Sequence, residues 1–259
     1  PLVHLDVLHE TARYLAEVAL NQTPAALSKP VYDIVSRVTG VRDPFAKLKQ
    51  ETNKAALRLL PALEERVRKA RDPLKAAIHL AVAGNIIDLG IGHPFDLSRD
   101  VVHILTQRFA VEDLPAFRRD LHKAHKLVYL GDNAGEIVFD RVLIQILQEA
   151  GLDVTFVVKS EPIINDATMA DAVAAGLTKL CTVIETGSAD IGVNWKHVSS
   201  EFRRRVRDAD LILAKGHGNF ETCTGQPGTF YFLLKAKCAM VAEELGVRLG
   251  DIVFKREKH

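Results

Sequence analysis

The chain has 259 residues, of which 47% are hydrophobic and 26% charged, the balance of a soluble globular protein with one large domain or two modest ones. Lysine and arginine number 34 against 33 aspartate and glutamate residues, which does not suggest a nucleic-acid partner. No apolar run is long enough to span a membrane, no signal-peptide pattern opens the chain, and the three cysteines have no paired spacing, so we expect a cytoplasmic protein without a membrane partner.

The first half of the chain carries its apolar residues at helical spacing. Amphipathic stretches cover Leu5–Leu20, Asp43–Leu60 and Asp72–Asp88, and the last two open with an aspartate followed by a proline, a helix start signal. No strand-like alternation of convincing length appears in this half. We therefore predict a mostly helical N-terminal region over residues 1–124.

The second half changes to short apolar runs separated by helical stretches. The runs that predict buried strands are 127–130, 154–158, 181–184, 211–214 and 251–254. Strands that alternate with helices and lack polar positions are typical of a parallel sheet covered on both faces. The expected fold is α/β, with a Rossmann-like three-layer sheet domain over residues 125–259 preceded by the helical region.

Polar residues follow three of the predicted strands, at the points where the strands end. Asp132 and Asn133 follow the first, Asp166 lies in the loop after the second, and Lys215–Glu221 follows the fourth. Because ligands of open α/β sheets bind at the carboxyl ends of the strands, these loops are expected to form one site. Taken singly, each loop is more often an ordinary turn or a helix cap; three such loops in one sheet favour a shared site.

Carboxylate and amide oxygens are the ligands that Mg²⁺ and Mn²⁺ prefer, and these ions keep positions for water and phosphate. Asp132, Asn133 and Asp166 could supply such an incomplete shell. The helix start near Gly135 offers backbone N–H groups to an anion. In the third loop, glycines allow a phosphate to approach the backbone, and Lys215 adds a positive charge. The basic run at 203–207 could also hold phosphate, although such a run is usually a solvated helix face.

The sequence resembles a known family at these residues. Gly131–Asp140 looks like the core motif of the damage-control phosphatases, formerly the domain of unknown function 89. Pro162–Thr168 and Lys215–Glu221 are similar to two further motifs of that family. In the helical half, Asp43–Asn53 and Ala83–Asp88 resemble family segments, so the resemblance covers nearly the whole chain.

The resemblance implies a metal-dependent phosphatase that acts on damaged or surplus metabolites, commonly sugar phosphates or phosphorylated cofactor intermediates. The implied cofactor is a divalent metal, Mg, Mn, Co or Ni, held by Asp132, Asn133 and Asp166. Phosphate would be bound by Lys215 and Asn219. The other implied substrate-side residues are Glu136, Asn85, Asp88, Gly216, His217 and Gly218.

The sequence departs from the family pattern at two points. Members of this size often carry a Cys-x-x-Cys pair near the N-terminus, and none is present here. The third loop more usually has Gln or Met where His217 stands, so a histidine there could tune substrate choice or add a metal ligand.

The nucleophile is either a water activated by the metal or Asp132 itself, through an aspartyl-phosphate. A rival reading is an S-adenosylmethionine-dependent methyltransferase, in which Gly131–Gly135 would be the glycine loop after the first strand. That loop is poor in glycine, and methyl transfer has no evident need for Lys215. A third reading is a non-catalytic regulator that binds metal or metabolite. The sequence carries no indication of oligomeric state.

Overall fold

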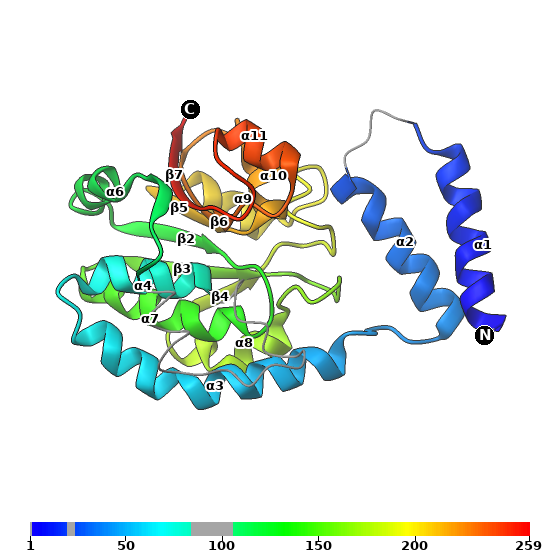
Figure 1. Ribbon diagram of the computed structural model, residues 1–259, viewed down its shortest axis with the longest axis horizontal. Helices are drawn as coiled ribbons and strands as arrows, with labels where there is room; N and C mark the ends of the chain where they lie inside the picture. The colour runs from blue at the N-terminus through cyan, green and yellow to red at the C-terminus, as the bar shows by residue number, and fades with distance from the viewer. Residues whose placement is uncertain (1, 20–23, 84–105) are drawn as a thin grey trace.

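The computed structural model describes residues 2–19, 24–83 and 106–259, and within these ranges its centre is a seven-stranded sheet (Figure 1). The strands are β1 (Phe109–Glu112), β2 (Lys126–Leu130), β3 (Asp153–Val158), β4 (Thr182–Glu185), β5 (Leu211–Lys215), β6 (Thr229–Lys235) and β7 (Ile252–Lys258). Their order across the sheet is β1-β7-β6-β5-β2-β3-β4, and neighbours are parallel except for β6 and β7. The α/β prediction is therefore confirmed.

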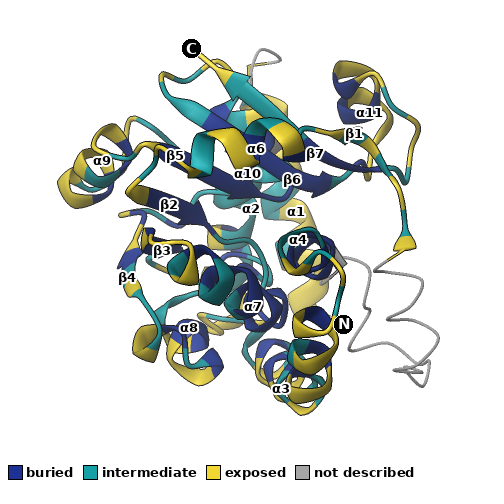
Figure 2. Ribbon diagram, turned by 90° about the vertical axis from the view of Figure 1, so that its left-hand side faces the viewer, coloured by how far each residue is buried: buried dark blue, intermediate teal, exposed yellow. Residues whose placement is uncertain are grey.

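The central strands are mostly apolar because both faces of the sheet are covered. Successive side chains of β2 enter opposite cores: Leu127 and Tyr129 join the larger core, and Val128 and Leu130 join the smaller one. Figure 2 shows the middle of the sheet as buried, with exposed residues on the outer surfaces of the helices. A single sheet thus separates two hydrophobic cores, as expected of a three-layer domain.

Helices form the two outer layers. They are α1 (Leu2–Glu17), α2 (Pro24–Thr39), α3 (Ala46–Arg68), α4 (Pro73–Ala83), α6 (Leu114–Leu121), α7 (Glu136–Glu149), α8 (Met169–Ala175), the 3-10 turn η1 (Leu177–Lys179), α9 (Ser200–Arg207), α10 (His217–Cys223) and α11 (Ala239–Leu245). The larger core lies under α3, α4, α6, α7 and α8, and the smaller one under α9, α10 and α11. Of the helices within the described ranges, none has the length and apolar character needed to cross a bilayer.

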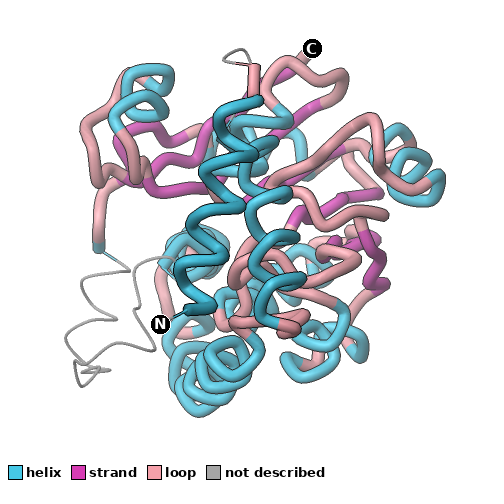
Figure 3. The backbone as a smooth tube through the Cα atoms, turned by 90° about the vertical axis from the view of Figure 1, so that its right-hand side faces the viewer, coloured by secondary structure: helices cyan, strands magenta, loops and turns pink. Residues whose placement is uncertain are grey.

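Helices α1 and α2 form a hairpin that stands apart from the layers (Figure 1). The pair lies in front of the edge at which the parallel strands end (Figure 3). Several large apolar side chains of α1 are exposed, and no residue of α1 is buried. The hairpin therefore adds little to the hydrophobic core and instead forms a wall beside the carboxyl edge of the sheet.

All five strands predicted from the sequence are present, as β2, β3, β4, β5 and β7. Two strands were missed. The expectation of no strand in the first half is wrong, because β1 pairs with β7; it is a four-residue edge strand, too short to show its alternation. β6 is a continuous apolar run with the same signal as its neighbours. The division at residue 124 stays a prediction.

The strand order places a topological switch point between β2 and β5. From β2 the chain goes on to β3 and β4 on one side, whereas β5 pairs with the other side of β2. The loops after β2 and β5 thus leave adjacent strand ends and lead to helices on opposite faces of the sheet, α7 over the larger core and α10 over the smaller one. The sheet edge at such a switch point is where ligands of open α/β sheets usually bind.

Candidate functional site

The loops that follow β2 and β3 are joined to each other by backbone hydrogen bonds. Asn133 and Asp166 form an isolated antiparallel bridge. The Ala167 amide donates to the Asp132 carbonyl oxygen at 2.9 Å, and the Ala134 amide donates to the Asn165 carbonyl oxygen at 2.9 Å. The three residues predicted as metal ligands, Asp132, Asn133 and Asp166, are therefore brought together.

Local backbone requirements show that this junction is tightly built. A Cβ atom at Gly131 would lie 2.6 Å from the Phe156 ring, so only glycine fits directly before Asp132. Ile164 has a φ of 44°, which a β-branched residue rarely adopts. Strain of this kind persists where the surroundings enforce it, often at functional sites. Here it directly precedes the Asn165–Asp166 loop.

The Asn133 side chain is oriented by two carboxylates. Its Nδ2 donates to Glu136 Oε1 at 2.9 Å and to Asp132 Oδ2 at 3.2 Å. Because the nitrogen serves both carboxylates, the amide oxygen is the atom left to coordinate a cation. Glu136 thus has a positioning contact with a predicted ligand.

Lys215 lies beneath the site, at the end of β5, and is fully buried. Its Nζ is 2.7 Å from Asp140 Oδ1 and 3.5 Å from Glu136 Oε2. The Tyr129 hydroxyl also donates to Asp140 Oδ1, at 2.8 Å. Burial alone would lower the pKa of Lys215, but Asp140 and Glu136 outweigh it and raise that pKa, so the lysine stays charged.

The acidic groups repel one another in a dry environment. Burial raises the pKa of Glu136 to about 8. The positive charge of Lys215 opposes this shift, and the nearby negative charge of Asp132 adds to it. Burial likewise raises the pKa of Asp166 to about 7, again with a contribution from Asp132 and with Lys159 opposing it. Perturbed carboxyl groups around a shared point are typical of functional sites, and here the shared neighbour is Asp132.

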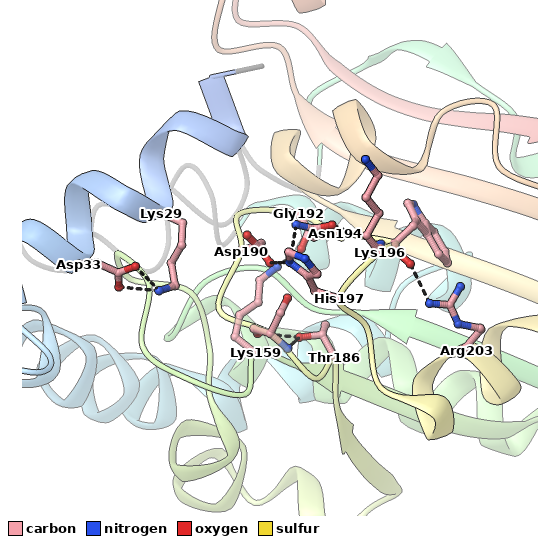
Figure 4. A network of polar contacts seen from close by, with 12 residues as sticks. Lys29, Asp33, Lys159, Thr186, Asp190, Gly192, Asn194, Lys196, His197 and Arg203 are labelled. Carbon is pink, nitrogen blue, oxygen red and sulfur yellow. Dashed lines mark hydrogen bonds and ion pairs between the residues drawn. The ribbon is translucent and has the colours of Figure 1, made fainter. Parts of the chain in front are cut away.

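Lys159 is a second buried cation at the strand ends. It follows β3, its Nζ donates to the Gly192 carbonyl oxygen, and the same atom lies 3.7 Å from Asp166 Oδ2. Figure 4 shows Lys159 pointing toward Gly192 in the loop after β4. Sequence analysis assigned Lys159 no role, although its place directly after a strand could have suggested one.

The loop after β5 packs directly against Asp132. Gly216 has a φ of 82°, and a Cβ atom there would lie 2.1 Å from Asp132 Oδ2. Gly218 touches the loop after β4, where a Cβ atom would lie 2.9 Å from the Gly192 nitrogen. Both glycines therefore allow close approach, Gly216 of a predicted metal ligand and Gly218 of a neighbouring loop.

Two predicted substrate-side residues make contacts with the protein backbone. His217 Nε2 lies 2.8 Å from both the Lys235 carbonyl oxygen and the Lys237 nitrogen, at the end of β6. Asn219 Nδ2 donates to the Lys215 carbonyl oxygen at 2.7 Å and to the Gly131 carbonyl oxygen at 3.0 Å. Asn219 thus ties the ends of β5 and β2 together across the switch point.

The sequence predicted that free N–H groups at the start of α7 would bind an anion. For Ala134 and Gly135 this prediction is wrong, because both N–H groups are already hydrogen-bonded. The Ala134 N–H is bonded within the junction described above. The Gly135 N–H donates to Asn53 Oδ1 at 2.7 Å. Neither N–H group is available to a phosphate, because the helix start is packed against α3 and the β3 loop. Asn85 and Asp88, predicted to reach the site from the helical half, lie outside the described residues.

The charge of the centre fits a cation. Acidic and basic side chains in one linked cluster are Asp43, Asp132, Glu136, Asp140, Asp166 and Asp171, with Lys49, Lys159 and Lys215. Acids outnumber lysines by six to three, so full ionisation needs further positive charge. Within the described ranges, no three or more His, Cys, Asp or Glu residues form a metal-holding group. Two carboxylates and an amide instead suit an ion that keeps several waters, such as Mg²⁺.

A cavity of about 170 Å³ opens beside this centre, between α2 and the loop after β3. Its walls include Lys29, Tyr32 and Arg42 on one side and Ile163 and Ile164 on the other. Burial raises the pKa of Tyr32, and the charge of Asp166 adds to the effect, so the cavity lies within electrostatic reach of the predicted ligands. Lys29 pairs with Asp33 on α2 (Figure 4).

Known proteins are similar to this chain in sequence and in fold. The profile of the damage-control phosphatase ARMT1-like domain matches residues 4–253. A damage-control phosphatase of Pyrococcus horikoshii is 37% identical over 241 residues, 92% of this chain and 83% of that protein. A damage-control phosphatase of Archaeoglobus fulgidus is 35% identical over 253 residues, 95% of this chain and 87% of that protein. A crystal structure of a DUF89 family protein from P. horikoshii matches with a TM-score of 0.91 and 35% identity, covering 99% of this chain and 90% of that one.

Proposed function

The chain belongs to the damage-control phosphatase ARMT1-like family, and on that premise we propose that it is a metal-dependent phosphatase that hydrolyses phosphate monoesters of small metabolites. The observation that carries the proposal is the acidic centre at the switch point between β2 and β5, where Asp132 and Asn133 are half-buried and Asp166 is buried. The family supports phosphate chemistry over the methyl-transfer alternative. Sugar phosphates and damaged phosphorylated cofactor intermediates are the proposed substrates, and the cytoplasm is the proposed location.

The proposed metal is Mg²⁺, Mn²⁺, Co²⁺ or Ni²⁺, held by the Asp132 and Asp166 carboxylates and the Asn133 amide oxygen. Bound there, it would neutralise charge on the phosphoryl oxygens as the ester bond breaks. The Asn133 nitrogen keeps the ligand amide in place through Asp132 and Glu136. This arrangement is set before substrate arrives, which is the condition for effective electrostatic catalysis.

The two buried lysines have different proposed tasks. Lys159 stands beside Asp166 at the strand ends and would attract a phosphoryl oxygen of the substrate. Lys215 is held below by Asp140 and Glu136 and compensates the charge of Asp132 from the protein side. The rest of the substrate would extend into the cavity lined by α2.

The decisive experiment is a screen of phosphorylated metabolites with each of the four metals in turn, by release of inorganic phosphate. The proposal predicts turnover that EDTA abolishes and added metal restores. Metal binding without turnover across a broad ester panel would contradict it and favour the non-catalytic regulator. The stereochemistry at a phosphorus atom made chiral with oxygen isotopes separates the two nucleophiles. A single in-line attack by water inverts the configuration, whereas two successive displacements through an aspartyl-phosphate retain it.

A further inference from the structure

Asn53 of α3 is a buried amide that joins two loops distant from it in sequence. Its Oδ1 accepts the Gly135 N–H at 2.7 Å, and its Nδ2 donates to Asp171 Oδ1 at 2.9 Å. Both functional ends of the side chain are therefore engaged. α3 lies in the outer layer, so Asn53 links the N-terminal helices to the segments that follow the strand ends.

Each contact of Asn53 lies close to a predicted metal ligand. Gly135 comes two residues after Asn133, in the turn that leads from β2 into α7. Asp171 Oδ2 accepts from the Thr168 backbone nitrogen at 2.9 Å and from the Thr168 hydroxyl at 2.8 Å. Thr168 in turn comes two residues after Asp166. One amide thus fixes the loop of Asp132 and Asn133 relative to the loop of Asp166.

The remaining contact of Asp171 is with Lys49, which also pairs with Asp43. Lys49 Nζ lies 3.5 Å from Asp171 Oδ2 and 2.7 Å from Asp43 Oδ2. Asp43, Lys49, Asp171 and Asn53 thus form a chain of polar contacts. Within it, the Lys49 and Asn53 side chains are buried. Buried polar groups of this kind are costly unless every member has a partner, so the loss of one member affects the rest.

An asparagine suits this position because one atom must accept while the other donates. Aspartate would keep the acceptor for the Gly135 N–H but would face the Asp171 carboxylate without a donor. Alanine would leave the Gly135 N–H and Asp171 Oδ1 without their partner. Gly135 itself sits close to α3, since a Cβ atom there would lie 3.1 Å from the Thr52 Cβ.

We propose that Asn53 is a positioning residue for the metal centre, which sets the spacing between the Asp132–Asn133 pair and Asp166 through Gly135 and Asp171. The inference rests on the proposed metal-dependent function. It gives the N-terminal helices a part in metal binding, in addition to forming a wall of the substrate cavity. Groups that orient ligands without touching the metal commonly change metal affinity or activity by about 10- to 100-fold.

The test measures Mn²⁺ binding directly, by the free-ion electron paramagnetic resonance signal, on the metal-free protein without substrate. Asn53→Ala is expected to weaken Mn²⁺ binding by about tenfold and to speed hydrogen exchange of the Gly135 amide. The matched control is Gln148→Ala, at the C-terminal end of α7. It removes another side-chain amide contact, from Gln148 Nε2 to the Leu180 carbonyl oxygen at 2.9 Å. The control should lower thermal stability while leaving Mn²⁺ affinity within about twofold.

An exchange of the two partners separates positioning from general destabilisation. Asn53→Asp places a carboxylate opposite the Asp171 carboxylate, so no donor lies between them. Asp171→Asn places an amide opposite the Asn53 amide, so one of its donors faces another donor. Each single variant should therefore lose Mn²⁺ affinity. The double variant restores a donor opposite an acceptor, and its affinity should return to within about threefold of the parent protein, a coupling expected of contacting residues.

The outcomes are distinct. A parent protein that binds none of Mg²⁺, Mn²⁺, Co²⁺ and Ni²⁺ would overturn the proposed function and with it the positioning role. An Asn53→Ala variant that binds Mn²⁺ with the same affinity as the parent protein would overturn the positioning role alone. A double variant no better than the single variants would also overturn it, whereas recovery supports it.

Discussion

Two groups of charged side chains meet at the carboxyl edge of the sheet, and they are built differently. Beneath Asp132, the Lys215, Asp140 and Glu136 side chains are almost wholly buried and paired with one another. On α2 and the turn that follows it, Lys29 is half-buried and Arg42 is exposed, beside a cavity. The buried group cannot lose a member without leaving a charge in an apolar environment. The wall can change with little effect on the fold, so it is suited to select the substrate.

The largest effect is expected when the buried group loses its cation. Lys215→Met should lower the free energy of unfolding by about 3–5 kcal/mol, because Asp140 and Glu136 would be left without their compensating charge. The matched control is Lys75→Met, which breaks a partly exposed pair with Glu112 at 2.5 Å and should cost about 0–1 kcal/mol. Urea denaturation of both variants provides the measurement, and equal losses would refute the contrast.

The second prediction separates activity from stability. Asp132→Asn should lower phosphatase activity by at least about a hundredfold, since it removes the negative charge of a predicted metal ligand at the reacting centre. The same change relieves repulsion at Glu136 and Asp166, so the metal-free protein should melt at a higher temperature than the parent. Asp33→Asn on α2 serves as the comparison and should alter neither property strongly. Retention of full activity in Asp132→Asn would remove Asp132 from the mechanism.

The third prediction tests how closely the loop after β5 must approach Asp132. Gly216→Ala should cost about 1–3 kcal/mol of stability and about tenfold in activity, because its Cβ atom would displace the carboxylate. Gly246 also has a positive φ, 67°, but in the left-handed helical region that other residues enter at lower cost, and no atom lies within 4 Å of an added Cβ. Thermal denaturation and kinetic assay should show a smaller loss of stability in Gly246→Ala than in Gly216→Ala, and loss of activity in Gly216→Ala alone.

The candidate metal ligands could be predicted from the sequence, whereas the buried residues that hold them in place could not. Asp132, Asn133 and Asp166 could be predicted to converge because strand ends of a parallel sheet meet at one edge, and the structure brings them together. Tyr129 and Asp140 could not, because one occupies a position in an apolar strand and the other a position in an amphipathic helix. The Lys215–Asp140 pair spans 75 residues of sequence, and no local pattern records such a contact.

Asn53 illustrates the same limit from the helical half. Its segment resembles the family, but the resemblance gives no partner, and both of its partners lie far away in sequence. Tertiary contacts of this kind depend on how α3 is placed against α7, which helical periodicity leaves undefined. For the same reason the sequence could predict neither the cavity beside α2 nor the engagement of the Gly135 N–H.

The fourth prediction concerns pH and the metal-free protein. The pKa values of Asp166 and Glu136 are raised in the fold to about 7 and about 8, so the fold favours their protonated forms. Their contribution to stability is present below the pKa values of the unfolded chain and is lost as the pH rises through 7 to 8. In EDTA, stability should fall between pH 5 and 8, by about 1.4 kcal/mol per pH unit for each group below its raised pKa, and by less in Asp132→Asn. A steeper fall in the variant would show that Asp132 is not the source.

The smallest effect is expected on the wall, where it should appear in substrate choice. Arg42 is exposed, lines the cavity, and has no side-chain contact among the described residues. Arg42→Ala should raise KM by about three- to tenfold for phosphate esters that carry a second anionic group, leave kcat unchanged, and leave esters with neutral leaving groups unaffected. Arg37→Ala is the control, because Arg37 on α2 pairs with Glu10 of α1 at 2.6 Å. A fall in kcat with every ester would place Arg42 with the buried group, whereas a selective rise in KM would confine its role to the wall.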